Sequence, residues 1–576
     1  MFKLLKKAKP YTKLIVGVVV LLFAAAMFDL LLPTLMSKIV NEGIESGDTH
    51  FIIVVGIQML GVSLASVICS ICSNYLSSKA SMSLGRDLRS ETFRKITYYS
   101  MHEVDKFGTA SLITRTTNDV RQMQMVLQMG LRQIVSMPLH LIGGIVMAAS
   151  MDVTLATIIV VAMPLLLIII ALNINWVRPL FRIMMDKLDR VNLVLREILS
   201  GVRVIRAFDR LDYEHDRFNN TNKDYTDTNR KARHRMALMH PLTMMVMNGA
   251  TVAILWFGQY RINVGAMTTG DLMAFSQYVM QILGSVMGIR MIFNMIPRAM
   301  VSAGRINEIL DTNSDIVDPI VPKTPAKNVR GYVKFENVTF KYPGAEEAVL
   351  SNISFETRPG ETTAIIGGTG SGKSTLITLI PRLYDIQEGK ISVDGVSISE
   401  MTQKDLRSRI GFIPQKALLF TGTIADNIRY GKMDASDEEV RAAADIAQAT
   451  EFIDAMAEGF DSFLSQDATN VSGGQKQRIS IARALIKKPE IYIFDDSFSA
   501  LDFKTDAMLR AALKPVTKDA TVIIVAQRVS TVMNADRIIV LDDGKCVGLG
   551  THKELLNTCE VYREIVSSQL KEEEIA

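Results

Sequence analysis

Cysteine, tryptophan and surplus charge are all scarce in this sequence. Only four cysteines and two tryptophans occur among 576 residues, and Cys69 and Cys72 form a C-x-x-C inside an apolar run without a second ligand pair. A disulfide framework or a structural zinc site is therefore not expected. We interpret all four cysteines, Cys546 and Cys559 included, as packing residues. The net charge of +4 is small for this length and does not indicate nucleic acid as a partner.

Apolar residues, by contrast, are abundant. They make up 48% of the chain, the mean hydropathy is +0.20, and 22% of residues are charged. A soluble enzyme with that charge content is usually less apolar, so the composition indicates a membrane part joined to a soluble part. The length also requires two or more domains. No cleavable signal peptide is expected, because the first apolar run is too long and lacks a small-residue cleavage site.

Six apolar stretches precede residue 300, and each is long enough to cross about 30 Å of hydrocarbon. They cover residues 14–36, 51–75, 134–151, 154–176, 238–260 and 272–296. The short intervals between them contain one basic residue, Arg261, whereas residues 79–132 and 178–235 are long and rich in Arg and Lys. This asymmetry places the long segments and both termini in the cytoplasm, and the chain in the cell membrane.

The two long cytoplasmic segments are predicted to be continuous helix beyond the membrane. Two glycine-bearing turns should interrupt them, near Phe107–Thr109 and Leu199–Gly201, and Pro179 is the single prolyl break. The stretch Phe2–Lys13 mixes basic and apolar residues, which is typical of an interfacial helix. A simple basic flank that obeys the positive-inside rule is the alternative.

Two charges interrupt the predicted spans, Asp29 in the first and Arg290 in the sixth. Such residues cost about 2.5–3.5 kcal/mol on insertion scales and usually face a bundle interior or a water-filled cavity. The alternatives are a position near the outer interface for Asp29 and an ion pair that only fixes packing for Arg290. Spans five and six are also rich in methionine, which suits varied apolar ligands but also simply fills cores. The methionines concerned are Met244, Met245, Met247, Met280, Met287 and Met291.

Residues 311–330 carry Pro319, Pro322 and Pro325 without apolar periodicity, which predicts a linker. The chain thus divides into an all-α transmembrane domain, residues 1–310, and a second domain, residues 331–576. In the second domain strand-like and helix-like runs alternate, which predicts an α/β fold with a parallel sheet.

A glycine-rich loop lies between a strand pattern at Thr362–Ile366 and a helix pattern from Leu376. It fits G-x-x-x-x-G-K-[ST], whose backbone N–H groups surround phosphates. Lys373 would reach the β- and γ-phosphates, and the Ser374 hydroxyl would bind Mg²⁺. The sequence therefore predicts ATP and Mg²⁺ as cofactors. The loop consists of Gly367, Gly368, Thr369, Gly370, Ser371, Gly372, Lys373, Ser374 and Thr375.

Two further motifs support a nucleotide site. Ile491–Asp496 is an apolar strand that ends in two acids about 120 residues after the loop, so that Asp495 would bind the Mg²⁺. Val471, Ser472, Gly473, Gly474 and Gln475 lead into a helix pattern that continues to Ile486, and Ser and Gly at a helix N-terminus form a second anion site.

With these motifs the chain resembles an ATP-binding cassette exporter half-transporter over nearly its whole length. Val471–Gln475 is similar to the family signature LSGGQ, and Ser499–Asp502 to the D-loop. The resemblance implies that Tyr342 stacks on adenine and that Gln415 senses the γ-phosphate and contacts Mg²⁺. It also implies that Asp502 belongs to the ATP site and that two cassettes close head to tail over ATP. Residues 114–120 and 200–208 resemble the family's cytoplasmic helical segments.

The sequence departs from the family at two catalytic positions. The family usually has Glu after the Mg²⁺-binding Asp, to polarise water, and this chain has Asp496. Its pKa is ordinarily close to that of Glu, about 3.9 against 4.3, but its reach is about 1 Å shorter, and such a misplacement can cost on the order of 10²-fold. The family's switch histidine is Gln527, which donates hydrogen bonds but carries no proton. A G-E-R-G-like stretch is replaced by Ser465–Ala468.

The intact signature beside two altered catalytic positions is typical of heterodimeric exporters. We therefore predict a chain that binds ATP in a site of impaired hydrolysis and supplies its signature to a partner half-transporter. The substrates would be hydrophobic or amphipathic compounds such as drugs or lipids, with the lipid bilayer as surroundings. A homodimeric lipid or peptide exporter and a nucleotide-gated regulatory membrane subunit are the alternatives. The sequence does not identify the substrate.

Overall fold

The computed structural model describes residues 1–326 and 330–569, apart from the side chains of Phe2 and residues 289–294. It divides into two compact units. The first comprises Met1–Thr97 and Ala110–Thr312, and the second Tyr98–Thr109 and Asn313–Ala576. The side chain of Arg290, predicted to interrupt a span, lies outside the described residues.

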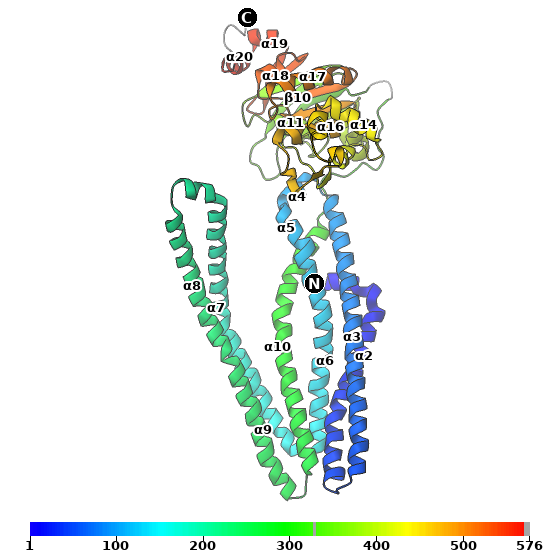
Figure 1. Cartoon of the computed structure of the whole chain (residues 1–576), viewed down its shortest axis with the longest axis vertical. Helices are drawn as coiled ribbons and strands as arrows, with labels where there is room; N and C mark the ends of the chain where they lie inside the picture. The colour runs from blue at the N-terminus through cyan, green and yellow to red at the C-terminus, as the bar shows by residue number, and fades with distance from the viewer. Residues whose placement is uncertain (327–329, 570–576) are drawn as a thin grey trace. The chain divides into compact units, whose positions relative to one another are not determined.

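The first unit is entirely helical (Figure 1). Its elements are α1 (Phe2–Leu5), a 3₁₀ segment (Lys6–Tyr11), α2 (Thr12–Lys38), a π-helical turn (Ile39–Ile44), α3 (Thr49–Thr97), α5 (Thr109–Thr114), a second π-helical turn (Arg115–Asp119), α6 (Val120–Met151), α7 (Val153–Ala207), α8 (Leu211–Ala237), α9 (Met239–Asn263) and α10 (Thr269–Asp311).

Five helical segments in the described part of the chain are long and apolar enough to cross a membrane. They are Lys3–Ile44, Thr49–Thr97, Thr109–Met151, Val153–Ala207 and Leu211–Asn263. The sixth predicted stretch falls in α10, which includes the residues whose side chains are not described. A helical domain with several membrane-spanning segments is thus confirmed.

One helix of this unit, α7, is longer than the sequence indicated. α7 continues without interruption from Val153 to Ala207, so the predicted turn at Leu199–Gly201 was wrong, as was the predicted break at Pro179. A glycine inside a helix costs only about 1 kcal/mol relative to alanine, which neighbouring helix formers offset. The chain turns instead at Asp209, with φ +51°. The predicted turn at Gly108 is confirmed, with φ +73°.

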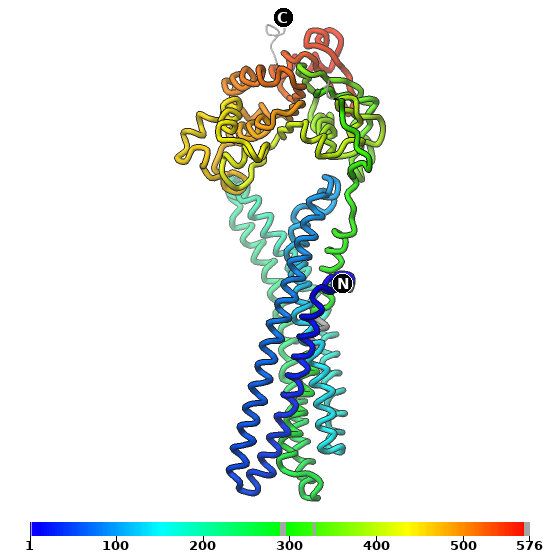
Figure 2. Tube along the Cα trace, turned by 90° about the vertical axis from the view of Figure 1, so that its right-hand side faces the viewer, coloured from blue at the N-terminus to red at the C-terminus, as the bar shows by residue number. Residues whose placement is uncertain are grey.

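The first unit has two groups of neighbouring helices. α2, α3, α6 and α10 lie side by side, and α7, α8 and α9 form a second, antiparallel group (Figures 1 and 2). At the N-terminus, Leu4 and Ala8 are buried against α3 and α6, where they contact the cluster around Leu84, Leu88 and Met123. The N-terminal segment is therefore part of the packed unit and is more than a basic flank.

The second unit contains two sheets. The larger has strand order β12-β11-β3-β10-β9-β6, parallel from β11 to β6. Its strands are β3 (Thr362–Gly367), β6 (Ile410–Ile413), β9 (Ile491–Asp495), β10 (Thr521–Val525), β11 (Arg537–Asp542) and β12 (Lys545–Gly550). The antiparallel sheet has the order β2-β1-β4-β5, with β1 (Val333–Phe340), β2 (Leu350–Thr357), β4 (Glu388–Val393) and β5 (Val396–Ser397). A short pair joins β7 (Gly422–Thr423) to β8 (Phe463–Leu464).

Helices surround these sheets, so the predicted α/β class of the second domain is confirmed. They are α4 (Met101–Phe107), α11 (Lys373–Leu379), α12 (Gln403–Ser408), α13 (Ile424–Arg429), α14 (Asp437–Ile446), α15 (Thr450–Asp454), α16 (Gly473–Leu485), α17 (Phe503–Val516), α18 (Val529–Val532), α19 (His552–Thr558) and α20 (Glu560–Ser567). Every residue of β9 is buried, as expected for a central strand that is apolar on both faces.

The cysteines differ in their surroundings. Cys559 is buried and Cys546 and Cys69 are half-buried, but Cys72 is exposed on α3. The interpretation of all four as packing residues was therefore wrong for Cys72, because the apolar run that contains it turns one face outward. All four are free thiols.

Candidate functional site

Four loops meet at one edge of the parallel sheet. Val525 at the end of β10 lies beside Ile365 of β3 and Asp495 of β9, and Ile413 of β6 lies beside Phe494. Because the carboxyl ends of parallel strands share an edge, the residues that follow these strands are brought together. They surround a cavity of about 270 Å³ whose walls include Lys373, Ser374, Thr375, Gln415, Asp495, Asp496 and Gln527.

The loop after β3 has a backbone that requires glycine. Gly370 and Gly372 have φ of +88° and +93°, in the left-handed region. A Cβ on Gly372 would lie 2.7 Å from a methyl of Leu350, and one on Gly367 would lie 2.0 Å from the carbonyl oxygen of Leu541. The loop is thus fixed in a tight turn that leads directly into α11.

Lys373 lies inside this turn. Its ammonium donates hydrogen bonds to the carbonyl oxygens of Gly367 and Gly368, at 3.0 and 2.6 Å, and all of its hydrogen-bond acceptors are uncharged. Burial lowers its pKa, while the carboxylates of Asp496 and Asp495 favour the charged form. A buried cation that hydrogen-bonds only neutral oxygens at the start of a helix fits an anionic ligand, so the loop is suited to the phosphates of ATP.

Two oxygen atoms next to the loop fit a magnesium ion. The Ser374 hydroxyl donates a hydrogen bond to Oδ1 of Asp495 at 2.9 Å, and Asp495 is buried at the end of β9. Burial raises the pKa of Asp495, and the hydrogen bond from Ser374 opposes this shift. A hydroxyl beside a carboxylate is an oxygen-only ligand pair, which Mg²⁺ prefers. Gln415, the third predicted ligand, lies in the same cavity.

Asp496 is held by two amides. Gln415 and Gln527 both donate from Nε2 to its Oδ2, at 3.3 and 3.1 Å. Its backbone has φ +47°, and its N–H donates to the carbonyl oxygen of Val525 at 2.9 Å. The two altered positions, Asp496 and Gln527, and the predicted γ-phosphate sensor Gln415 therefore form one hydrogen-bonded group.

Tyr342 lies beside the last residue of the loop, Thr375. Its hydroxyl is 3.1 Å from that of Thr375, and its ring makes edge contacts with Phe340 and Tyr384. Tyr384 in turn donates a hydrogen bond to Asp105 of α4 at 3.0 Å. Burial and this carboxylate raise the pKa of Tyr384 above its usual range.

The signature residues do not line this cavity. Ser472 caps α16, because its hydroxyl accepts a hydrogen bond from the N–H of Gln475 while Gln475 accepts one from the N–H of Ser472. Gln477 of the same helix donates to the carbonyl oxygen of Pro414 at 3.2 Å. Asp502 similarly caps α17, and a hydrogen bond from the N–H of Thr505 lowers its pKa.

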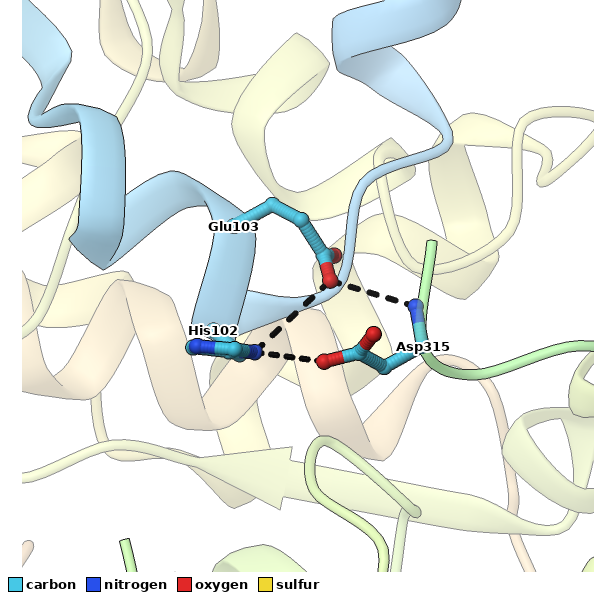
Figure 3. Close-up of side chains that lie close together, drawn as sticks. All are labelled: His102, Glu103 and Asp315. Atoms are coloured by element: carbon cyan, nitrogen blue, oxygen red, sulfur yellow. Dashed lines mark hydrogen bonds and ion pairs between the residues drawn. The ribbon is translucent and has the colours of Figure 1, made fainter. Parts of the chain in front are cut away.

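Sequence reasoning missed a second polar cluster at α4 (Figure 3). His102 Nδ1 lies 2.5 Å from Asp315 Oδ2, and Asp315 donates its N–H to Glu103. The other oxygen of Glu103 accepts hydrogen bonds from the N–H and hydroxyl of Ser100. One Glu103 oxygen thus caps α4 itself and the other joins α4 to Asp315, and the S-x-x-E spacing was the available signal.

The predicted in-span charge Asp29 lines a cavity of about 360 Å³ in the first unit. Among the methionines considered for ligand contact, Met245 lines an apolar groove of about 530 Å³ between α7 and α9.

The fold and this site define an ATP-binding cassette transporter. Residues 14–286 match the ABC transporter transmembrane region, and residues 350–499 match the ABC transporter family of ATPase domains. The chain belongs to the ABC transporter family.

Three comparisons describe its relatives. An uncharacterized ABC transporter ATP-binding protein of Mycobacterium tuberculosis (strain CDC 1551 / Oshkosh) is 43% identical over 564 residues, 97% of either chain. A fatty acid ABC transporter ATP-binding/permease protein of the same strain is 33% identical over 83% of this chain and 75% of its own. The solved structure of a bacterial Atm1-family ABC exporter with ATP bound has a TM-score of 0.80 and 27% identity, covering 97% and 99% of the two chains. The predicted exporter fold is thereby confirmed.

Proposed function

We propose that this chain is the half of a heterodimeric exporter that binds ATP in a site of impaired hydrolysis. The P-loop from Gly367 to Thr375 would hold the phosphates, with Lys373 as their counter-charge. Ser374, Asp495 and Gln415 would hold Mg²⁺, and Tyr342 would stack on adenine. The signature Val471–Gln475, with Asp502 nearby in sequence, would complete the partner's site.

The observation that carries this proposal is the hydrogen bonding of Asp496. Both amides donate to one of its oxygens, so part of the carboxylate that would position water is already engaged. The side chain is also one methylene shorter than Glu, and a displacement of about 1 Å in a reacting group can cost on the order of 10²-fold in rate. Gln527 cannot carry a proton or positive charge in place of histidine. These three features weaken hydrolysis without affecting the binding loop.

The first unit would supply the pathway. Six spans, α10 included, with the long helical segments, both termini and the ATPase domain on the cytoplasmic side, agree with the distribution of Arg and Lys. The relative named as a fatty acid transporter supports a substrate with an apolar tail. We therefore infer ATP-driven export of amphipathic, lipid-like compounds across the cell membrane.

The first test measures ATP hydrolysis by the full-length chain alone in lipid nanodiscs. We expect slow turnover together with tight binding of a fluorescent ATP analogue. Brisk turnover that is abolished by Asp496→Asn would overturn the proposed division of labour. Lys373→Ala, which removes the phosphate counter-charge, is the control for contaminating ATPases.

The second test uses the chain purified with the half-transporter that assembles with it in its own cells. In that complex Ser472→Ala should stop turnover, whereas Asp496→Asn should leave most of it. Equal losses would favour a homodimer-like mechanism, as in a lipid or peptide exporter whose two sites are the same. Vesicles that contain the complex separate export from regulation, because a pump accumulates substrate against its gradient and a nucleotide-gated regulatory subunit does not.

A further inference from the structure

Two rows of polar side chains face each other along α3 and α6, and they extend from the predicted spans 51–75 and 134–151 into the adjoining cytoplasmic parts of these helices. α3 contributes Ser66, Ser70, Asn74 and Ser78, and α6 contributes Gln128, Arg132, Ser136 and His140. In each row the residues are four apart, so each row follows one face of its helix. We name these eight residues, with Asp29 of α2, the polar ladder. The three helices that carry it are neighbours (Figures 1 and 2).

The rows are joined in antiparallel register. Gln128 Nε2 donates to the Ser78 hydroxyl at 2.7 Å, and one turn further Arg132 donates to Asn74 at 3.4 Å. At the far end Asp29 joins the rows, because it accepts a hydrogen bond from Ser66 at 2.6 Å and lies 3.3 Å from His140 Nε2.

Between these connections the ladder lines the cavity of about 360 Å³. Ser70 and Ser136 lie on its wall. Asn74 and Arg132 at one end are exposed, and Asp29 and His140 at the other end are half-buried. The end at Asp29 and His140 lies within the predicted spans, whereas Arg132 lies at the edge of the predicted cytoplasmic segment 79–132. A polar hollow that reaches into the membrane is stable when it holds water or a polar ligand. The cavity therefore runs from an open end at the exposed Arg132 and Asn74 to the half-buried Asp29–His140 pair.

Asp29 and Arg132, two charged residues of the ladder, differ in whether they have a charged partner. Asp29 has His140 and Ser66 as partners. The guanidinium of Arg132 has one long hydrogen bond to a neutral amide and no ion pair within the described residues. Eight residues of helix, about 12 Å, separate Arg132 from His140, so the Asp29 carboxylate does not compensate it at contact distance. The uncompensated charge at the open end is positive.

We propose that the polar ladder binds the anionic headgroup of an amphipathic substrate, with Arg132 as its charge partner. The carboxylate or phosphate lies against Arg132 and Asn74, uncharged polar parts of the head reach toward Ser70 and Ser136, and the apolar tail remains outside the ladder. A guanidinium suits either anion because it donates two parallel hydrogen bonds. This inference rests on the proposed export of amphipathic compounds and specifies their headgroup.

The test measures binding of cis-parinaric acid, a fluorescent fatty acid, and of its uncharged methyl ester to the full-length chain. The chain is held in phosphatidylcholine nanodiscs without ATP. The native chain should bind the acid in preference to the ester, and Arg132→Gln should weaken acid binding about tenfold or more while changing ester binding little. Arg132→Lys should retain most of the preference. Arg121→Gln, an exposed arginine of α6 outside the ladder, is the matched control and should bind as native.

A second variant and a second lipid complete the design. Ser70→Leu fills the cavity while it leaves Arg132 in place, and it should also lose acid binding about tenfold, which keeps the proposal testable if Arg132→Gln does not fold. Displacement of the acid by phosphatidylglycerol in the discs would assign the site to a phospholipid head, and lack of displacement to a free carboxylate. Equal binding of acid and ester by the native chain, or native acid binding by both variants, overturns the proposal. The binding assay contains neither ATP nor a partner chain. Its result therefore does not depend on whether the proposed transport cycle is correct.

Discussion

Gln527 donates a hydrogen bond from Nε2 to Oδ2 of Asp496 over 3.1 Å. The two residues come from loops that follow neighbouring strands, β10 and β9, at the positions for which the family resemblance predicts the switch and water-positioning roles. The two positions at which the sequence departs from the family are therefore in direct contact, with the amide as donor and the carboxylate as acceptor. Because the two side chains are hydrogen-bonded to each other, a test of the proposed impaired hydrolysis should change both residues together.

Restoration of the family residues at both positions should increase hydrolysis. In the full-length chain alone, Asp496→Glu combined with Gln527→His should raise ATP turnover by on the order of 10²-fold, because the carboxylate regains its reach. Phosphate release in nanodiscs measures the effect. Each single change should give much less than the pair, and addition of Lys373→Ala should remove the gain. An unchanged rate in the double variant would show that Asp496 and Gln527 do not limit hydrolysis.

Asp495 should determine the magnesium dependence of nucleotide binding. In Asp495→Asn the ion loses a charged ligand beside Ser374, so the increase in affinity of a fluorescent ATP analogue on adding Mg²⁺ should fall by about tenfold. Affinity in EDTA should remain close to native. Asp496→Asn is the matched control, because the carboxylate of Asp496 accepts hydrogen bonds from two side-chain amides and is not a proposed magnesium ligand. This variant should retain the magnesium effect. An Mg²⁺ response in Asp495→Asn equal to that of the native chain would contradict the assignment.

The hydrogen bond from Tyr384 to Asp105 should hold α4 in place. Tyr384→Phe and Asp105→Asn should each speed hydrogen exchange of the Met101–Phe107 amides about five- to tenfold, which corresponds to about 1 kcal/mol for one such bond. The double variant should add little, because both changes remove one interaction. Tyr430→Phe removes an exposed hydroxyl in the same unit and should leave α4 unaffected. Fully additive effects would show that the two side chains act separately.

Acid should loosen the C-terminal helices. Burial, with Lys553 nearby, lowers the pKa of His552, whose Nδ1 lies 2.7 Å from the hydroxyl of Tyr562. Because the folded pKa lies below the unfolded value of about 6.5, the unfolded state binds the extra proton, and stability is lost as pH falls below that value. Protection of α19 and α20 against hydrogen exchange, corrected for intrinsic rates, should decrease from pH 7.5 to 5.5. His552→Gln should flatten this dependence, and an unchanged slope would assign it to other groups.

The binding half of the site could be predicted because its motifs are local. The loop before Lys373 and the acids after β9 are contiguous in sequence, and their neighbours in the sheet follow from strand order. The joint hydrogen bonding of Asp496 by Gln415 and Gln527 could not be predicted, because it depends on side-chain geometry across three strands. Asp29 was visible as a charge in an apolar run, but the serines opposite α6 were not, since isolated serines occur in many membrane helices.

The errors have similar physical causes. Gly201 looked like a turn because glycine is a poor helix former, yet the 55-residue helix α7 includes it. Cys72 looked like a packing residue because its run is apolar on all sides, whereas only one face of α3 is covered. In both cases the environment of the whole helix overrode the preference of one residue.

The hydrogen bond from Gln477 to the carbonyl oxygen of Pro414 connects the signature helix to the residue before Gln415. Under the proposed head-to-tail closure, Gln415 faces this chain's own nucleotide while the signature faces the partner's. In such a dimer, this one side chain would link the two proposed ATP sites directly. ATP bound in this chain's site would then control when the partner's site is assembled. This chain's site would regulate ATP hydrolysis in the dimer, even though it hydrolyses little ATP itself.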